Sequence, residues 1–293
     1  MQPLTDDIFQ FLRDSGIEAS HRTVDGVNIL TVSCNDAERI ILPVGIKAAT
    51  PAEAQDCAKA IQEFISRKSG PYPLIIPEDR WRRQTEMMKG RLLAHLEVFT
   101  PVYARNCEIR RIDKPTAAEF LNRTHAYGDA ACKYRYGIFL KRNTGHIAKE
   151  GRCGIPAGTL IAAGTFSNAR KWIKNGKEIR SYEWTRFASL PEVRISGGMG
   201  KILKAFIEEV RPDDIMSYAD LEWSEGTVYE HLGFTLEGRK DPVMFEIDTE
   251  WERHPVRSAT TLHCGEGDKS RPDDLFFCNF GSNKYRLKLT EYE

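Results

Sequence analysis

The first 77 residues switch between helical and strand-like hydrophobic patterns. In residues 4–14 the apolar positions lie three and four apart, which predicts an amphipathic helix. Three strand-like runs follow at 17–24, 26–34 and 38–45, and Asp25-Gly26 between the first two is typical of a tight hairpin turn. Thr50-Pro51-Ala52-Glu53 then has the cap, proline and acid that begin a helix, and residues 73–77 read as a further strand. We therefore predict a small α+β domain over residues 1–77.

This order of helix, three strands, helix and strand resembles the core of restriction-endonuclease-like nucleases. The resemblance implies an Asp on one strand and an Asp/Glu-x-Lys on the next, which together hold a divalent cation. The corresponding stretches, NILTVSC and RIILPVG, contain no carboxylate pair and no lysine. Without oxygen ligands Mg²⁺ is not held. We expect either a nuclease-like domain that has lost its site or an unrelated α+β domain.

Residues 78–101 connect this domain to the next. The stretch 78–98 has Trp81, Met88, Leu92 and Leu96 at helical spacing. We predict one continuous amphipathic helix that bridges the two domains.

Residues 102–250 have a different pattern, of strands interleaved with helices. Strands are predicted at 102–112, 132–142, 159–170, 179–190 and 214–220, and helices at 114–128, 196–210 and 225–232. Two final strands, 233–239 and 242–248, are predicted to pair with each other. The tail, 251–293, is polar, with a late strand-like run at 276–289 that could join either sheet.

A glycine-rich turn opens the helix at 196–210, in the stretch EVRISGGMGKILKAFIEEV. Three glycine residues fall within four positions there, at Gly197, Gly198 and Gly200. Such a turn leaves backbone N–H groups unpaired at the positive end of a helix, which favours binding of a phosphate or pyrophosphate. Lys201 adds a positive charge. The alternative is a tight strand-to-helix connection that binds nothing.

Two stretches, YEWTRFASLPEVRISGGMGKILKAF and SYADLEWSEGTVYEHLGFTLEG, together resemble the Gcn5-related N-acetyltransferase (GNAT) superfamily. The resemblance covers residues 102–248 and implies an α/β (α+β) fold with a mixed, mostly antiparallel central sheet and flanking helices. It also implies that the turn binds the pyrophosphate of acetyl-coenzyme A. The residues that would then border this co-substrate are Phe187, Ala188, Ser189, Arg194, Ser196, Gly197, Gly198, Met199, Gly200 and Lys201.

The same resemblance assigns two catalytic positions. Tyr229, in the short helix before Leu-Gly-Phe, would protonate the leaving thiolate, and Glu183, on the strand before the turn, would accept the proton of the acceptor amine. Tyr229 could instead be a core aromatic residue, and Glu183 a surface partner of Arg180 or Arg186. The turn also departs from the family pattern Gln/Arg-x-x-Gly-x-Gly/Ala by one extra residue between Arg194 and the last glycine, which changes the amides that face a pyrophosphate.

A narrower likeness concerns YARNCEIRRI, FLNRTHAYGDA and YEWTRF, together with GGMGK. These stretches resemble an acetyltransferase-like module of phage and mobile-element proteins, sometimes associated with nuclease domains. The likeness implies substrate handling by His125 and Asp220. The alternatives are a histidine satisfied near a helix end and an aspartate that caps the short helix.

The charge and composition of the chain indicate which partners, compartment and metal sites to expect. The net charge is zero, but residues 67–142 hold 16 Lys/Arg against 8 Asp/Glu, which gives +8. This basic segment could contact the phosphates of a nucleic acid or of a coenzyme, and the alternative is a solvated helix face rich in arginine. Seven cysteine residues without a CxxC pair favour reduced thiols in a cytoplasmic protein. The sequence contains no run of 18 apolar residues, so no membrane span is predicted. His263, Cys264 and Cys278 do not match a zinc spacing, so no metal is expected.

Two functions of different classes follow. The first is acyl transfer from a coenzyme A thioester to an unidentified amine. The alternative is a nucleic-acid-associated accessory or modification module without acetyl-coenzyme A, and a catalytically silent interaction domain is a third possibility. In the nucleic-acid alternative the phosphate contacts would come from Arg80, Arg82, Arg83, Lys89, Arg110 and Arg111.

Overall fold

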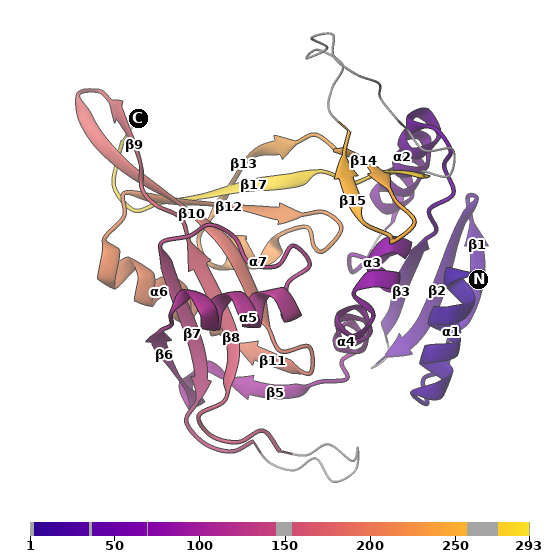
Figure 1. The fold of residues 1–293 in the computed structure, drawn as a ribbon, viewed down its shortest axis with the longest axis horizontal. Helices are drawn as coiled ribbons and strands as arrows, with labels where there is room; N and C mark the ends of the chain where they lie inside the picture. Colours follow the sequence, from indigo (N-terminus) through magenta and orange to yellow (C-terminus); the bar gives the residue numbers. More distant parts are fainter. Residues whose placement is uncertain (1–2, 35–36, 69, 145–153, 257–274, 293) are drawn as a thin grey trace. The chain divides into compact units, whose positions relative to one another are not determined.

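The computed structural model describes residues 3–34, 37–68, 70–144, 154–256 and 275–292, and it divides into two compact units (Figure 1). Unit 1 combines Met1–Met88, Ala219–Gly226 and Arg239–Asn283, and unit 2 combines Lys89–Tyr218, Thr227–Gly238 and Lys284–Glu293. Each unit is therefore built from segments that are distant in sequence. The domain limits expected from the sequence stay a prediction.

The first sheet of unit 1 has the predicted order of elements, α1 (Leu4–Asp14), β1 (Ser20–Val24), β2 (Val27–Cys34), β3 (Ala37–Val44), α2 (Pro51–Arg67) and β4 (Leu74–Pro77). Its strands lie in the order β1-β2-β3-β4, antiparallel except for the parallel pair β3–β4. Asp25 and Gly26 turn the first hairpin with φ of 50° and 78°, which an Asp-Gly pair tolerates.

The predicted start of α2 is confirmed. Thr50 Oγ1 accepts a hydrogen bond from the Glu53 amide at 3.3 Å, Pro51 is the first helical residue, and the Glu53 carboxylate accepts from the Ala49 amide at 2.8 Å. These bonds satisfy amide groups that a helix start leaves unpaired.

The single helix predicted over 78–98 is wrong. The chain forms α3 (Glu78–Arg83), a break at Gln84 with φ −122° and ψ 40°, and then α4 (Thr85–His95). The Thr85 hydroxyl lies 2.8 Å from the Trp81 carbonyl oxygen, four residues back. Back-bonding of this kind competes with the helical ladder, so a threonine inside a regular hydrophobic pattern can interrupt a helix.

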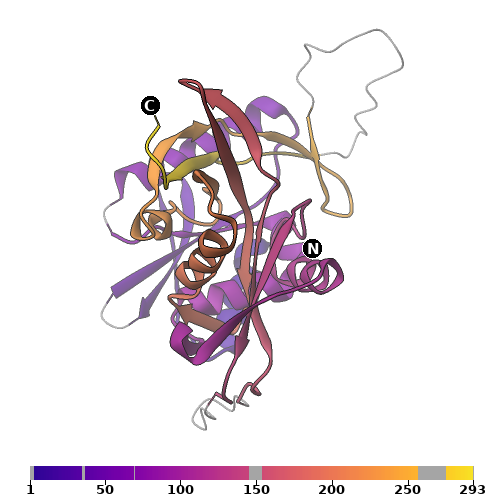
Figure 2. The same cartoon turned by 90° about the vertical axis from the view of Figure 1, so that its left-hand side faces the viewer.

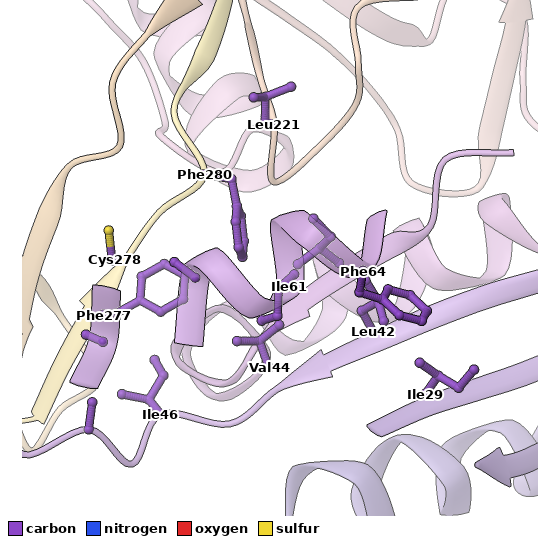
Figure 3. Packing of buried hydrophobic residues seen from close by; sticks show 14 of the residues in the cluster. Ile29, Leu42, Val44, Ile46, Ile61, Phe64, Leu221, Phe277, Cys278 and Phe280 are labelled. Atoms are coloured by element: carbon purple, nitrogen blue, oxygen red, sulfur yellow. The ribbon is translucent and has the colours of Figure 1, made fainter. Parts of the chain in front are cut away.

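The core of unit 1 lies between α2, one face of the first sheet and a second sheet of three strands, ordered β15-β14-β16. Those strands are β14 (Met244–Ile247), β15 (Arg253–Pro255) and β16 (Leu275–Cys278). Figure 3 shows Ile61 and Phe64 of α2 beside Leu42 and Val44 of β3, with Phe280 directed toward them.

Unit 2 is built on the large sheet, ordered β13-β17-β12-β10-β8-β7-β6, with β9 paired to β10 (Figures 1 and 2). Its pairs β6–β7, β7–β8, β8–β10 and β9–β10 are antiparallel, whereas β10–β12 is parallel, so the predicted mixed, mostly antiparallel sheet is confirmed. The strands are β6 (Cys107–Arg111), β7 (Tyr134–Leu140), β8 (Leu160–Phe166), β9 (Arg170–Lys174), β10 (Lys177–Ser189), β12 (Asp214–Asp220), β13 (Thr235–Lys240) and β17 (Ser282–Lys288).

Two smaller groups of elements complete unit 2. The strands β5 (Thr100–Tyr103) and β11 (Val193–Ser196) form a separate parallel pair. The helices are α5 (Lys114–Thr124), α6 (Gly198–Val210) and α7 (Thr227–His231), with one 3-10 turn, η1 (Ala104–Asn106). No helix among the described residues of either unit is long and apolar enough to cross a lipid bilayer.

The helices α5 and α6 cover opposite faces of the large sheet. Phe120 and Leu121 of α5 pack on Ala163 of β8, while Phe206 of α6 stacks on Phe166 of β8 with ring centroids 3.8 Å apart. Positions 163 and 166 differ in parity, and side chains alternate between faces along a strand. Both faces of β8 are therefore buried, which explains why Thr165 is its only polar side chain.

The late strand-like run at 276–289 divides between two sheets. Its first part forms β16 beside β14, and its second part forms β17 between β12 and β13. The hairpin predicted from 233–239 and 242–248 is wrong, because β13 pairs with β17 and β14 pairs with β15 and β16. Arg286 of β17 donates to Asp214 of β12 at 2.6 Å and to Glu237 of β13 at 2.7 Å. These two carboxylate partners of Arg286 stabilise β17 in its position between β12 and β13.

Candidate functional site

The two parallel strands at the centre of the large sheet separate part-way along their length. β10 and β12 are paired from Ser181↔Asp214 to Glu183↔Met216. Beyond Glu183, the register described for β10 is with β8 alone, through to Ser189. The Ser217 hydroxyl, 3.0 Å from the Trp184 carbonyl oxygen, marks the point of separation. We call this region, between β10 residues 184–189 and the end of β12, the split.

A bulge in β10 lies at the same point. Trp184 is opposite Phe166 of β8, but Arg186 is opposite Thr165, so Thr185 is an extra residue. A bulge changes which side chains face each side of a sheet. Trp184, on the α6 face with Phe166, is therefore followed by Phe187 on that face.

The candidate base Glu183 lies on the other face of β10, which α5 covers. Its backbone amide donates to the Ser167 hydroxyl at 2.9 Å. The nearby Arg186 donates from Nε to the carbonyl oxygen of Gly128, in the segment after α5, at 3.0 Å. Burial lowers the pKa of Arg186, and the charge of Glu183 opposes that shift. Glu183 is half-buried, so part of its side chain is exposed to solvent.

The three predicted acyl-bordering residues end β10. Phe187, Ala188 and Ser189 pair with β8 along one edge of the strand. The Ala188 side chain belongs to the core against α5, so only its backbone can border a ligand. Among the described residues no strand pairs with residues 187–189 on the side away from β8, although the neighbouring Arg186 carbonyl oxygen accepts from Trp184 Nε1 at 3.0 Å. An unpaired strand edge can bind an extended chain that carries amide groups.

The glycine-rich turn forms the start of α6, as predicted. Gly197 caps the helix with φ 78°, a left-handed conformation that favours glycine, and the Lys201 amide donates to the Gly197 carbonyl oxygen at 3.0 Å. In the described part of the chain, no acceptor is seen for the amides of Gly198, Met199 and Gly200. Three N–H groups therefore remain at the positive end of a 13-residue helix.

The glycine residues of the turn differ in what a side chain would meet. A Cβ at Gly198 would lie 2.9 Å from Ile195 Cγ2, so this glycine is required by packing. A Cβ at Gly200 would lie 3.2 Å from Leu232 Cδ2, the flexible end of a side chain. The need for glycine at 198 thus has a structural cause that is independent of any ligand.

The other residues predicted at the turn have partners within unit 2. Lys201 Nζ donates to the carbonyl oxygens of Ala104 and Cys107 at 2.8 and 2.5 Å, so its ammonium group is held by the backbone beside β6. The Arg194 guanidinium lies 5.8 Å from the ring centroid of Phe99. Ser196 is exposed at the end of β11. Their predicted contacts with a coenzyme stay predictions.

Tyr229 of α7 lies beside the split. Its hydroxyl is 2.8 Å from Ser217 Oγ. Its ring stacks on Tyr285 of β17 at 5.3 Å and meets Trp184 edge-on at 6.2 Å. Burial raises the pKa of Tyr229, and the Ser217 hydrogen bond opposes that shift. The phenol is therefore protonated at neutral pH.

Ser217 has one hydroxyl hydrogen and two possible acceptors, the Trp184 carbonyl oxygen and Tyr229 Oη. When Ser217 donates to the carbonyl, Tyr229 donates to Ser217. When Ser217 donates to Tyr229, the phenolic hydrogen of Tyr229 becomes available to another acceptor. Ser217 and Trp184 were not predicted from the sequence. Their hydrogen bonds depend on where β10 and β12 separate, and the pattern of residues does not indicate that point.

The two residues predicted to handle substrate are placed separately. His125 follows α5 in unit 2, and its Nδ1 accepts from the Tyr127 amide at 3.1 Å. Asp220 belongs to the segment Ala219–Gly226 of unit 1, where its carboxylate accepts from the Glu222 amide at 2.9 Å. The bond of His125 is that of a histidine satisfied near a helix end, whereas Asp220 bonds ahead of the short helix α7 (Thr227–His231) and does not cap it. The substrate roles of both residues stay predictions.

Most arginine residues of the basic segment 67–142 proposed for phosphate contacts are in ion pairs. Arg80 lies near Glu222, Arg82 near Asp7 and Glu78, Arg83 near Glu252, Arg110 near Glu108, and Arg111 near Glu209. Arg80 is also buried. Each of the five arginine residues proposed for phosphate contacts therefore has at least one carboxylate within 4.0 Å.

No group of three or more His, Cys, Asp or Glu residues that could hold a metal is found in the described ranges. Cys278 is buried in the core of unit 1, whereas His263 and Cys264 lie outside the described residues.

Comparisons with known proteins were made on sequence and on structure. No family model matches the chain, and no curated protein matches it in sequence. Among solved structures, the chain is similar to Eis1 from Mycobacterium abscessus, with 14% identity, a TM-score of 0.32, and coverage of 48% of this chain and 33% of Eis1. It is also similar to yncA from Salmonella typhimurium, solved with its cofactor acetyl-CoA, with 14% identity, a TM-score of 0.34, and coverage of 64% and 96%.

A third similar structure is an acetyltransferase of the GNAT family from Bacillus anthracis, with 13% identity, a TM-score of 0.30, and coverage of 62% of this chain and 95% of that one. The match thus spans a third of Eis1 but nearly all of the two shorter proteins. These similarities are distant resemblances to GNAT acetyltransferases. Scores and identities this low do not establish membership of the family.

Proposed function

We propose that unit 2 transfers an acyl group from a coenzyme A thioester to an amine. The observation that carries this proposal is the split, with the three unbonded amides at the start of α6 and the Tyr229 phenol in the same unit. An unpaired strand edge suits the amide-rich pantetheine arm, and a helix start suits a pyrophosphate. A coenzyme A thioester contains both groups.

The proposed reaction needs one proton acceptor and one proton donor. The amine nitrogen attacks the thioester carbonyl carbon, the C–S bond breaks, and the acyl group forms an amide. Glu183, on the α5 face, accepts the proton that the amine loses. Tyr229, on the other side of the split, donates a proton to the sulfur, so that coenzyme A leaves as the thiol.

Ser217 prepares Tyr229 for this step. While the Ser217 hydrogen points to the Trp184 carbonyl, the phenolic hydrogen is held in the protein. Rotation of the Ser217 hydroxyl toward Tyr229 Oη releases that hydrogen toward the split and stabilises the phenolate that remains. A buried phenol would otherwise be a weak acid, because burial raises its pKa.

The test is the thermal stability of the full chain with coenzyme A, compared between two variants of the half-buried Met199. Met199→Glu adds a negative charge to the first turn of α6, which favours the helix but repels a pyrophosphate. Met199→Gln changes the shape similarly without the charge. Ligand at 100 times its Kd stabilises the folded state by about 2.7 kcal/mol.

We expect coenzyme A to stabilise the natural chain and Met199→Gln, and to leave Met199→Glu unchanged. No stabilisation of the natural chain by coenzyme A or acetyl-coenzyme A would overturn the proposal. Equal stabilisation of both variants would show that the pyrophosphate does not bind at the start of α6.

A further inference from the structure

The hairpin of β9 and β10 extends beyond the neighbouring strands of the large sheet, with the C-terminus of the chain beside it (Figures 1 and 2). β9 pairs only with the first part of β10, from Lys177↔Lys174 to Ser181↔Arg170. Asn175 and Gly176 form its turn with φ of 49° and 74°, which suits the tight turn of a two-stranded ribbon. The tip sequence, RKWIKNGK, holds four cations and no acid.

The two faces of this ribbon differ in how their charges are compensated. On one face, Lys171 forms an ion pair with Glu178 at 3.0 Å, and Arg180 with Asp213 at 3.6 Å. We call the opposite face, defined by Arg170, Trp172, Lys174 and Lys177, the cationic face. No carboxylate of the described residues forms an ion pair with its three cations.

Lys174 and Lys177 are direct cross-strand partners. Like charges in this position destabilise a sheet, so the pair weakens the hairpin unless an anion lies between the two ammonium groups. The face that carries Lys171 has no such repulsion between like charges, since Glu178 lies beside Lys171. The hairpin thus tolerates two adjacent positive charges at its most projecting point.

The C-terminal segment adds an aromatic and a cationic group to the cationic face. Trp172 meets Tyr292 edge-on with ring centroids 5.6 Å apart, and 37% of Trp172 is exposed. Lys174 Nζ and Lys288 Nζ lie 5.9 and 4.9 Å from the Tyr292 ring centroid. Two ammonium groups therefore lie near the Tyr292 ring, which itself packs on Trp172.

We propose that the cationic face binds the phosphate backbone of a nucleic acid. Uncompensated lysine and arginine residues attract phosphates and release their counterions. A two-stranded ribbon also fits the major groove of a duplex, and an exposed tryptophan can stack on the bases of a single strand. An acidic protein or an anionic membrane would use the charges but neither of these two features. The inference is independent of the proposed acyl transfer.

The experiment measures binding of the full chain to a fluorescein-labelled 20-nucleotide DNA by anisotropy, as single strand and as duplex, at several salt concentrations. Lys174→Gln/Lys177→Gln removes two charges from the cationic face. The matched control, Lys171→Gln/Lys204→Gln, removes two exposed lysine charges that already have carboxylate partners, Glu178 and Glu208. All four side chains are on the surface, so both double variants are expected to fold.

We expect the first double variant to bind at least tenfold more weakly at low salt, with a salt slope smaller by about two, because each phosphate contact contributes about 0.9 to the slope on duplex DNA. The control should bind as the natural chain does. Single-strand preference, lost in Trp172→Leu, would identify stacking, and duplex preference would identify groove binding.

Three results would overturn the proposal. The first is an absence of binding to either form of DNA by the natural chain at 50 mM salt. The second is an equal loss in the two double variants. The third is binding to polyglutamate or to phosphatidylserine vesicles without binding to DNA, which would assign the face to a protein or a membrane.

Discussion

Polar groups are buried in both units, but the two networks end differently. In unit 1, Arg253 of β15 donates from Nε and Nη2 to Asp79 at 2.5 and 3.0 Å, and from Nη1 to Glu222 at 2.6 Å. In unit 2, two hydroxyl groups, of Tyr229 and Ser217, and the Trp184 carbonyl form a hydrogen-bonded chain beside the split. The first network is built of charged groups, and the second is an open chain of neutral groups.

The difference matches a structural role for the network of unit 1 and the proton donation proposed for Tyr229. In the charged network two carboxylates share Arg253, and Arg80 lies 4.0 Å from Glu222. The network joins three segments of unit 1 that are far apart in sequence. Removing one member leaves an unpaired buried charge, which costs much more than the pair contributes. The open chain contains only neutral groups, so breaking it costs little stability. It is therefore suited to proton transfer.

The largest effect is expected for Arg253→Met, which leaves Asp79 and Glu222 buried without their shared partner. The free energy of unfolding should fall by about 3–5 kcal/mol, as measured by urea denaturation. Arg83→Met is the control, since its ion pair with Glu252 is exposed and should contribute at most about 1 kcal/mol. Similar losses in the free energy of unfolding for both variants would remove the distinction between a buried charge network and a surface ion pair.

The next effect concerns the open chain. Tyr229→Phe should slow release of coenzyme A thiol from acetyl-coenzyme A, in the presence of a mixture of primary amines, by about a hundredfold, the lower end for a general acid. The affinity for coenzyme A should not change. Tyr285→Phe, which removes the hydroxyl of the stacked neighbour, should keep its rate. Equal rates for Tyr229→Phe and the natural chain would exclude Tyr229 from the reaction.

A smaller effect is expected at the start of α6. Gly198→Ala should destabilise unit 2 by about 1–2 kcal/mol, because its Cβ would meet Ile195 at 2.9 Å. Gly200→Ala should be neutral or stabilising, because alanine favours a helix and Leu232 can move. Thermal denaturation of the two variants would show this difference, and a stable Gly198→Ala would contradict the packing role.

The smallest effect is a pH dependence at β13 and β17. Hydrogen bonds from Arg286 lower the pKa of Glu237 to about 2. Because the carboxylate is bound in the folded state, its stabilisation is present above its usual pKa near 4.5 and is lost as the pH falls toward 2. The pair is partly exposed, so its contribution is at most about 1 kcal/mol.

Glu237→Gln should therefore show a shallower loss of thermal stability than the natural chain between pH 5 and pH 2. At pH 7 the variant should be slightly less stable. Parallel curves for the two proteins would show that Glu237 has no linkage to folding. Circular dichroism of both chains across this range provides the measurement.

Local patterns predicted the local structure well. The Asp25-Gly26 turn, the Thr50 cap and the glycine-rich start of α6 are all confirmed, since each depends on residues within a few positions of one another. The helix predicted over 78–98 is wrong because one hydroxyl, that of Thr85, bonds to the carbonyl four residues earlier. Hydrophobic spacing does not report such a bond.

The sequence by itself determined most of the elements and the glycine-rich helix start, because these follow from short-range periodicity and capping. The role of Tyr229 as an acid stays a prediction from the resemblance. Only the tertiary structure decided that β17 lies between β12 and β13, that β10 and β12 separate after Glu183, and that Ser217 bonds to Tyr229. Partner choice among strands depends on side chains distant in the chain, such as Arg286 with Asp214 and Glu237, and no local pattern contains that information.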